Sequence, residues 1–209
     1  MKYLDIQNSL MELKPIFTVK DIELAGFSVY PYMLSQWVDR GYIKRLGGGK
    51  YLFSKSEVLS EYIANHLREP SYVSLESALY YYNLTVDIPF HIISVTSKGT
   101  KKSTVGDKVF FYRHIKPEVF TGYVMKQLGT TTEIGKRFYI ATPEKALVDL
   151  FYLSPNTFKK VSDFKEARFH EEDMKKHIDW RGVYTLSLLY KNKSLQKRLS
   201  DFKDYIFLQ

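Results

Sequence analysis

The chain of 209 residues contains no cysteine. Disulfide bonds, thiolate nucleophiles and cysteine-based zinc sites are therefore excluded, and the composition fits a reducing compartment. The histidines show neither an HExxH motif nor another close metal-ligand spacing; they are His66, His91, His114, His170 and His177. We therefore predict no metal site and no cofactor.

The sequence also lacks an apolar run long enough to cross a bilayer. Asp5 stands where a secretory signal peptide would have its apolar centre. We therefore expect a cytoplasmic protein that does not associate with membranes. With 44% hydrophobic and 16% aromatic residues, the chain can bury two modest cores, although a single domain also fits its length.

Residues 17–54 have the pattern of a winged helix-turn-helix. Thr18 and Asp21 form a capping-box pattern that begins one helix, and Gly26 ends it. Pro31 suits the first position of a second helix, whose apolar face includes Trp37 as a core residue and which Gly41 ends. Two β-prone runs around three consecutive glycines follow, at residues 42–46 and 50–53, and they predict the wing.

Further helices are expected on both sides of this segment. Residues 1–13 carry apolar positions at helical spacing, and Ser54 with Glu57 forms a second capping-box pattern that predicts a helix ending near Leu67. Pro70 blocks further helix, so we place a domain boundary between residues 70 and 71. The predicted domains are 1–70, a DNA-binding winged helix-turn-helix, and 71–209.

The second domain is predicted to be mixed α+β with a helical C-terminal tail. Ser74 is predicted to begin a short helix. Two strands follow at 90–96 and 108–114, and we predict that they pair. Two more strands are predicted at 119–128 and 137–141, with a Thr- and Gly-rich turn between them. Thr142 and Pro143 have the residue types of a helix start. Near the end, one apolar stripe is expected to pack against its own domain; it consists of Leu195, Leu199, Phe202 and Ile206.

The net charge of +8 indicates a polyanionic partner. Residues 1–70 carry a net charge of only +1 and the remainder carries +7. Within the first domain, however, Arg40, Lys44, Arg45, Lys50 and Lys55 lie close together in the sequence. This local cluster matters more than the sum, because phosphate attraction is screened within about 8 Å at physiological salt.

The order of several motifs resembles that of the AbiEi family of antitoxins, from type IV toxin–antitoxin and abortive-infection systems of phage defence. The resemblance covers about residues 17–153. It rests on the winged helix with Arg40-Gly41-Tyr42-Ile43 and Gly49-Lys50-Tyr51, then on Tyr72-Val73-Ser74-Leu75-Glu76-Ser77-Ala78-Leu79, Ile93-Ser94-Val95-Thr96-Ser97 and Ala141-Thr142-Pro143-Glu144-Lys145-Ala146-Leu147-Val148-Asp149.

This resemblance implies a bifunctional regulator. The winged helix would bind inverted repeats in the double-stranded operator DNA of its own operon and repress it. The second domain would counteract a nucleotidyltransferase-like toxin encoded alongside, and direct contact between the two proteins is not implied.

The residues expected to contact DNA follow from the geometry of a helix-turn-helix, whose second helix enters the major groove. Gln pairs with adenine edges, Arg with guanine edges or phosphate, and Tyr hydroxyls contact phosphates. We expect base or phosphate contacts from Ser28, Tyr30, Tyr32, Ser35, Gln36 and Arg40, and backbone contacts from Lys44, Arg45 and Lys50. The alternative is a helical hairpin or a winged helix that contacts only protein.

Two polar groups of the second domain have an ordinary and a functional interpretation. Lys145 and Asp149 pair at a spacing of four along one helix; with Glu76, Arg113 and Glu144 they would instead form a polar patch for a toxin or for phosphoryl chemistry. The second group is a basic loop at residues 97–103 and its surroundings, either simply solvated or contacting RNA or an acidic toxin surface. It comprises Lys98, Lys101, Lys102, Lys108, Arg113 and Lys116.

The leading hypothesis is an antitoxin and autorepressor that acts by binding, with no catalytic residue. Two alternatives stay open. One is an enzyme that modifies a toxin or nucleotide through Lys145 and its acidic neighbours, and the other is a ligand-sensing transcription factor with no antitoxin role. The glycines before Lys50 do not have P-loop spacing, because Tyr51 stands where a Ser or Thr is required.

Overall fold

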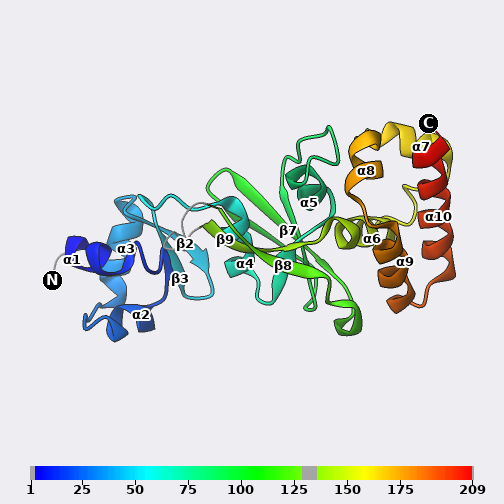
Figure 1. Ribbon diagram of the computed structural model, residues 1–209. Helices are drawn as coiled ribbons and strands as arrows, with labels where there is room; N and C mark the ends of the chain where they lie inside the picture. The colour runs from blue at the N-terminus through cyan, green and yellow to red at the C-terminus, as the bar shows by residue number, and fades with distance from the viewer. Residues whose placement is uncertain (1–2, 129–135, 209) are drawn as a thin grey trace.

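The computed structural model describes residues 3–128 and 136–208. Figure 1 shows three parts along its length: N-terminal helices with a small sheet, a central larger sheet, and a group of C-terminal helices. The predicted α+β class, with a winged helix-turn-helix followed by a mixed domain and a helical tail, is confirmed. Within the described ranges, no helix combines the length and apolar character needed to span a membrane.

The N-terminal lobe has the predicted order of elements: α1 (Tyr3–Leu10), β1 (Ile16–Phe17), α2 (Val19–Leu24), α3 (Pro31–Asp39), β2 (Ile43–Gly47) and β3 (Lys50–Phe53). Thr18 caps α2, because its Oγ1 accepts a hydrogen bond from the Asp21 amide at 3.4 Å. The Asp21 carboxylate accepts from the Thr18 amide at 2.7 Å, which completes the capping box. Pro31 occupies the first turn of α3, as predicted.

The wing is a β-hairpin within a three-stranded antiparallel sheet of order β1-β3-β2. Strand β1 is too short to show an alternating pattern, which is why the sequence did not predict it. At the tip, Gly47, Gly48 and Gly49 have φ values of 87°, 59° and 73°. Side-chain-bearing residues rarely adopt these values, so the glycine run defines the turn.

Helix α4 (Ser60–Leu67) begins five residues later than predicted, with Leu59 and not Ser54 at its cap, so the prediction of a capping box at Ser54 is wrong. Ser56 Oγ instead donates to the Phe53 carbonyl at 2.6 Å, and this closes a turn directly after the wing. The chain is still extended at Leu59, with φ −71° and ψ 149°. Helix α4 then packs on the central sheet, where its Tyr62 and Ile63 join the larger core. The boundary at residues 70 and 71 stays a prediction.

The central sheet has six strands in the order β6-β7-β5-β4-β9-β8. They are β4 (Ser71–Val73), β5 (Ile92–Thr96), β6 (Lys101–Val105), β7 (Lys108–His114), β8 (Tyr123–Gln127) and β9 (Arg137–Ala141), with a short 3-10 helix η1 (Pro117–Val119) before β8. The predicted pairing of residues 90–96 with 108–114 is confirmed as the parallel pair β5–β7. The Thr- and Gly-rich turn predicted between the last two strands falls at residues 129–135, outside the described residues.

The basic segment predicted to be a loop at residues 97–103 is partly a strand. Lys101–Val105 forms β6, the edge strand paired antiparallel with β7. Its polar residues hide the strand pattern from the sequence, because an edge strand tolerates lysines that a central strand would not. The lysines of β6 therefore stand along one edge of the sheet.

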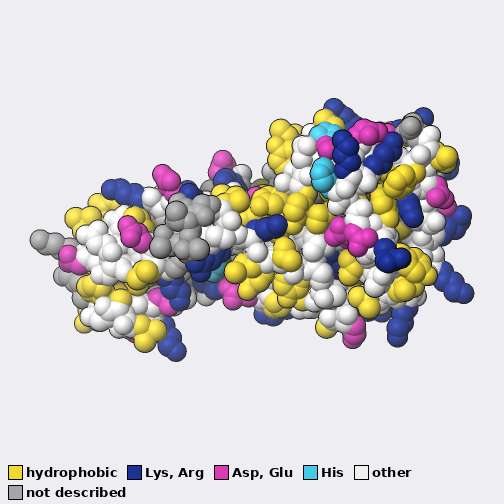
Figure 2. Space-filling model, viewed as in Figure 1, with side chains coloured by type: hydrophobic (Ala, Val, Ile, Leu, Met, Phe, Trp, Pro, Cys, Tyr) yellow, Lys and Arg dark blue, Asp and Glu magenta, His cyan; other side chains and the backbone are white. Residues whose placement is uncertain are grey.

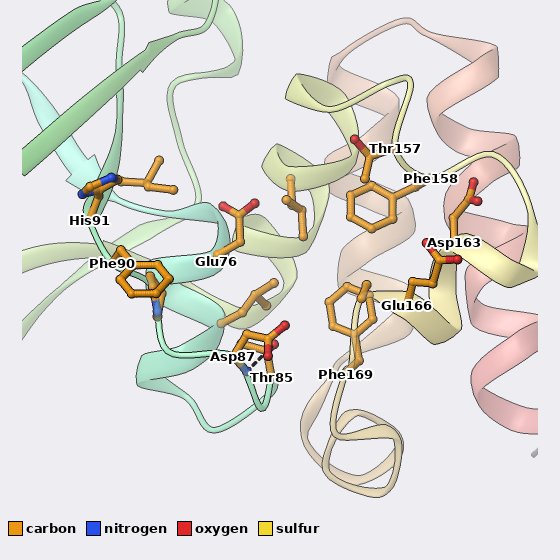
Figure 3. A pocket seen from close by; sticks show the side chains of 15 residues that line it. Glu76, Thr85, Asp87, Phe90, His91, Thr157, Phe158, Asp163, Glu166 and Phe169 are labelled. Carbon is orange, nitrogen blue, oxygen red and sulfur yellow. Dashed lines mark hydrogen bonds between the residues drawn. The ribbon is translucent and has the colours of Figure 1, made fainter.

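The remaining helices are α5 (Leu75–Tyr81), α6 (Pro143–Leu153), α7 (Val161–Glu166), α8 (Glu171–His177), α9 (Trp180–Leu189) and α10 (Lys193–Leu208). Thr142 caps α6 and Pro143 follows it, as predicted. The apolar stripe of α10 is buried against its own domain, which confirms that prediction as well. Between α5, α7 and the loop that leads into β5 lies a cavity of about 510 Å³ (Figure 3).

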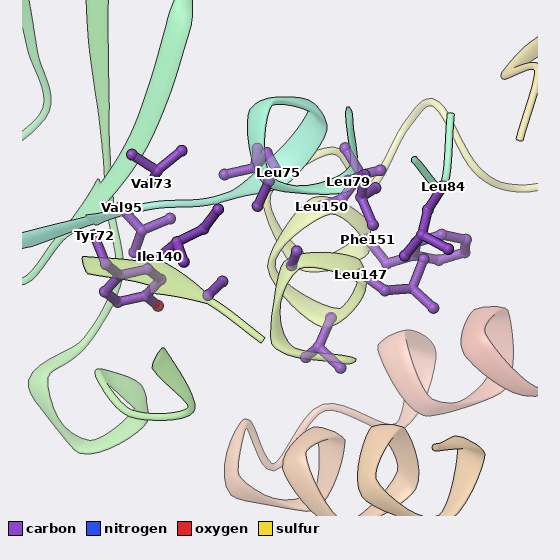
Figure 4. Packing of buried hydrophobic residues seen from close by; sticks show 14 of the residues in the cluster. Tyr72, Val73, Leu75, Leu79, Leu84, Val95, Ile140, Leu147, Leu150 and Phe151 are labelled. Carbon is purple, nitrogen blue, oxygen red and sulfur yellow. The ribbon is translucent and has the colours of Figure 1, made fainter. Parts of the chain in front are cut away.

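The buried hydrophobic residues form two clusters. The smaller one fills the N-terminal lobe around Phe17, Ile22, Trp37 and Phe53. The larger one runs from the sheet through α5 and α6 into the C-terminal helices, and Figure 4 shows its central part around Tyr72, Val95 and Phe151. In the view of Figure 2, hydrophobic side chains gather over the middle of the molecule, and Lys and Arg side chains lie toward both ends.

Thr18→Ala should lower the stability of the N-terminal lobe by about 1 kcal/mol, because it removes the acceptor of the Asp21 amide at the start of α2. Urea unfolding followed by tryptophan fluorescence checks this. Thr100→Ala, at an exposed loop threonine, is the matched control and should leave the midpoint unchanged. An equal loss in both variants would contradict the capping role.

Candidate functional site

The residues predicted to contact DNA lie at the surface of α3 and the wing. Eight of the nine are exposed: Ser28, Tyr30, Tyr32, Ser35, Gln36, Arg40, Lys44 and Arg45. Tyr30 and Tyr32 are 63% and 62% exposed, and their rings stack with centroids 6.0 Å apart at the start of α3. Trp37 is only 5% exposed, which confirms it as a core residue. Helix α3 thus presents a polar and aromatic face to solvent.

A groove of about 550 Å³ runs beside α3. Gln36 and Arg40 line it from α3, Tyr3 lines it from α1, and Tyr42 and Lys55 line it from the segments flanking the wing. Gln36 and Arg40 are one helical turn apart, so both side chains project to the same side of α3. The groove therefore combines an amide and a guanidinium, the two groups that form bidentate hydrogen bonds with base edges.

The cations of the wing are not equivalent. The Arg45 guanidinium lies over the Tyr51 ring, 5.7 Å from its centroid, and stays exposed, as does Lys44. Lys50 Nζ instead donates to the His66 carbonyl and to Glu69 Oε1, both at 2.8 Å. Through these two hydrogen bonds, Lys50 connects the wing to the end of α4.

The wing also meets the basic edge of the central sheet. A small groove of about 310 Å³ is lined by Gly47 and Gly48 of the wing tip together with Arg68, Lys98 and Lys101. Arg68 Nη2 donates to the Gly99 carbonyl at 2.9 Å, which holds the loop before β6 against the end of α4. Two of the predicted basic-loop residues therefore stand next to the wing.

Lys102, Lys108 and Lys116 are exposed as well, whereas Arg113 is half-buried. Lys102 Nζ lies over the Phe111 ring, 5.3 Å from its centroid. Lys108 Nζ donates to Ser60 Oγ at 2.7 Å, and Lys116 follows β7. Lys101 and Lys102 thus lie on the edge strand β6, and the other basic residues lie on segments next to it in the chain.

Lys145 and Asp149 form an ion pair with no solvent exposure on α6. Lys145 Nζ donates to Asp149 Oδ1 at 2.8 Å, to the Val119 carbonyl at 2.9 Å, and to Tyr190 Oη. These three acceptors satisfy all three ammonium protons.

The carboxylate is equally well satisfied. Asp149 Oδ1 also accepts from Tyr190 Oη at 2.6 Å, and Oδ2 accepts from Tyr72 Oη at 3.0 Å and from Ser74 Oγ at 2.8 Å. Ser74 begins α5 as predicted, but its hydroxyl donates to Asp149 and does not cap the helix. The pair is therefore a closed structural network.

Burial governs the protonation of this network. It raises the pKa of Tyr72 and of Tyr190, and the Asp149 carboxylate raises both pKa values further. Both hydroxyls therefore remain protonated donors at neutral pH. Burial lowers the pKa of the Lys145 ammonium, and Asp149 opposes that shift.

The other members of the alternative polar patch have contacts of their own, and the common patch stays a prediction. Glu144 Oε1 accepts from the Asp179 amide at 3.1 Å, and Arg113 Nη2 donates to the Leu153 carbonyl at 2.8 Å. Glu76 lines the cavity beside α5. Residues 146–148, 150 and 151 are all buried and apolar, and such an all-round apolar helix is the signal that α6 is internal.

Gly122 shows how tightly the network is enclosed. It has a φ of 75°, and a Cβ at this position would lie 3.1 Å from Lys145 Cγ. Only glycine fits both the backbone conformation and the close approach. Among residues 3–128 and 136–208, no three His, Asp or Glu side chains are arranged to hold a metal ion.

The fold is similar to that of the RV2827C protein from Mycobacterium tuberculosis, known from its crystal structure. The TM-score is 0.58 at 13% sequence identity, and the alignment covers 97% of this chain and 77% of that chain. At this identity the likeness shows the fold alone. No protein-family model matches the sequence, and no curated protein matches it either.

Asp149→Ala should destabilise the protein by about 3–5 kcal/mol, because it leaves a buried Lys145 ammonium without its counter-charge. Asp201→Ala is a matched control, since Lys197 and Asp201 have the same spacing on the solvent-facing side of α10, with 3.4 Å between their charged atoms. That pair should contribute less than about 1 kcal/mol. Urea midpoints measure both; similar losses would contradict the structural role of the buried pair.

Proposed function

We propose that this protein is a cytoplasmic DNA-binding autorepressor and an AbiEi-like antitoxin that acts by binding. The proposal that the protein binds DNA is supported by the exposed face of α3 together with the exposed cations of the wing, Lys44 and Arg45. If this face of α3 were buried in the protein core, the helix could not enter the major groove of DNA. Here Tyr32, Gln36 and Arg40 all face solvent.

Residues of α3 would form hydrogen bonds with the base edges of the DNA, and residues of the wing would contact its phosphates. Gln36 and Arg40 line the same groove, and Tyr30 and Tyr32 stand at the helix start, where hydroxyl contacts to phosphate are common. Lys44 and Arg45 would hold the backbone. Lys98 and Lys101 lie beside the wing tip, so a duplex that reaches the wing also approaches the basic edge of the central sheet.

The antitoxin half rests on the motif order shared with AbiEi antitoxins and proposes a nucleotidyltransferase-like toxin as the antagonist. The burial of Lys145 and Asp149 favours this binding role over the enzyme alternative, because neither side chain reaches a substrate in this conformation. The second domain would oppose the toxin through its surface.

Gln36→Ala with Arg40→Ala should abolish discrimination between the upstream operator and a scrambled duplex, because these side chains would supply the base contacts. Lys44→Ala with Arg45→Ala should weaken binding to both duplexes, and the slope of log K against log salt should fall by about 1 for each lost phosphate contact. Fluorescence anisotropy over a salt series measures both effects. Lys197→Ala with Lys203→Ala on α10 is the charge-matched control. Unchanged binding in both α3 and wing variants would reject this interface.

The full-length Gln36→Ala and Arg40→Ala double variant should still relieve growth inhibition by the toxin of the adjacent gene, because its second domain is intact. Co-expression of variant and toxin from independent promoters, with growth as the readout, checks this. Protection that disappears together with operator binding would contradict the separation of the two roles.

A further inference from the structure

The cavity between α5 and α7 belongs to neither proposed role. Its lining comes from α5, from the loop at residues 85–91, from α6 and the segment after it, and from α7. Figure 3 shows Glu76 between two aromatic sides, with Phe90 on one side and Phe158 and Phe169 on the other. At about 510 Å³, its volume is in the range of small-molecule sites.

Glu76 provides a polar group without a partner in this cavity. Its Oε2 is buried and has no hydrogen-bond partner among the described residues. Burial raises the pKa of the Glu76 carboxyl; its own backbone amide and the Arg113 guanidinium oppose that shift. Because an unsatisfied buried carboxyl oxygen is costly, a hydrogen-bond donor with a positive charge would stabilise it most.

The other carboxylates of the cavity add negative charge. Asp163 accepts from the amides of Lys159 and Lys160, and Asp87 pairs with Arg168 at 2.8 Å. Glu166 is exposed on α7 and lies on the same side as Asp163 in Figure 3. On a second domain that is basic overall, this concentration of acids selects against an anionic ligand.

The walls are aromatic and apolar. Phe158 is buried, Phe169 packs beside it, and Leu79 and Leu150 also line the cavity. At the rim, the Phe90 side chain is 98% exposed, so its ring is open to contact with a ligand. An aromatic ring there can cover the apolar part of a ligand or attract a cation to its face.

We propose that this cavity binds an organic cation, a primary ammonium or guanidinium carried on an apolar or aromatic body. The cationic head would donate to Glu76 Oε2, and the body would lie between Phe90 and the Phe158–Phe169 wall. The same chemistry is available from a free amine and from an Arg side chain of a partner protein. This inference does not depend on DNA binding or antitoxin activity.

The test titrates the full-length protein at neutral pH with three probes: 2-phenylethylammonium, the peptide acetyl-Gly-Arg-Gly-amide, and uncharged 2-phenylethanol. Calorimetry or NMR chemical shifts give the affinities. We expect saturable binding of at least one cation and weak or no binding of the alcohol. Binding of the amine alone would identify a small-molecule site, and binding of the peptide would identify a protein side chain as the ligand.

Glu76→Gln should weaken binding of the cation by about tenfold or more, because it removes the charge at unchanged size. Glu118→Gln, outside the cavity, is the charge-matched control and should stay within about twofold of the unmodified protein. Phe90→Ala should weaken binding of the aryl probe without affecting folding, since its side chain is exposed. Failure of both cations to bind, or equal affinity in Glu76→Gln and Glu118→Gln, would overturn the proposal.

Discussion

The second half of the structure depends on one buried ion pair. Lys145 and Asp149 join β4 through Tyr72, the start of α5 through Ser74, and the end of α9 through Tyr190. Figure 4 shows the apolar packing between sheet and helices in which Tyr72 lies. Because these side chains are buried, each of their polar atoms requires a hydrogen-bond partner within the protein. The network therefore determines that β4, α5, α6 and α9 pack together.

Two of the motifs that resemble those of AbiEi antitoxins meet at this pair. Tyr72 and Ser74 belong to one motif, and Lys145 and Asp149 belong to another motif about 70 residues later in the chain. These motifs therefore specify a fold, in agreement with the likeness to the RV2827C protein at 13% identity. Since one fold serves different functions, the case for DNA binding must come from surface residues such as Gln36 and Arg40.

Features that depend only on neighbouring residues in the chain, such as helix starts, could be predicted from the sequence. Helix starts with a cap or an N-terminal proline, at Thr18, Pro31 and Thr142, lie where they were expected. The capping pattern at Ser54 failed because a turn after the wing used the same residue types. Strand β6 was missed because an edge strand tolerates lysines and other polar residues, so its sequence lacks the apolar alternation that marks a strand. The burial of the Lys145–Asp149 pair could not be predicted for a related reason: spacing places both residues on one helix, but only tertiary packing shows that this helix is internal.

The two halves of the molecule are tied through α4. Lys50 of the wing contacts the end of this helix, Arg68 holds the loop before β6, and Tyr62 packs into the larger core. These contacts fix the position of the basic edge of the sheet relative to the wing. A DNA duplex bound to both surfaces would therefore have its phosphates at fixed positions on each of them. Helices α5 and α7, which line the cavity around Glu76, lie on the far side of the central sheet from the wing (Figure 1). A cation bound there would not touch DNA on α3, and any influence on repression would have to pass through the sheet and α4.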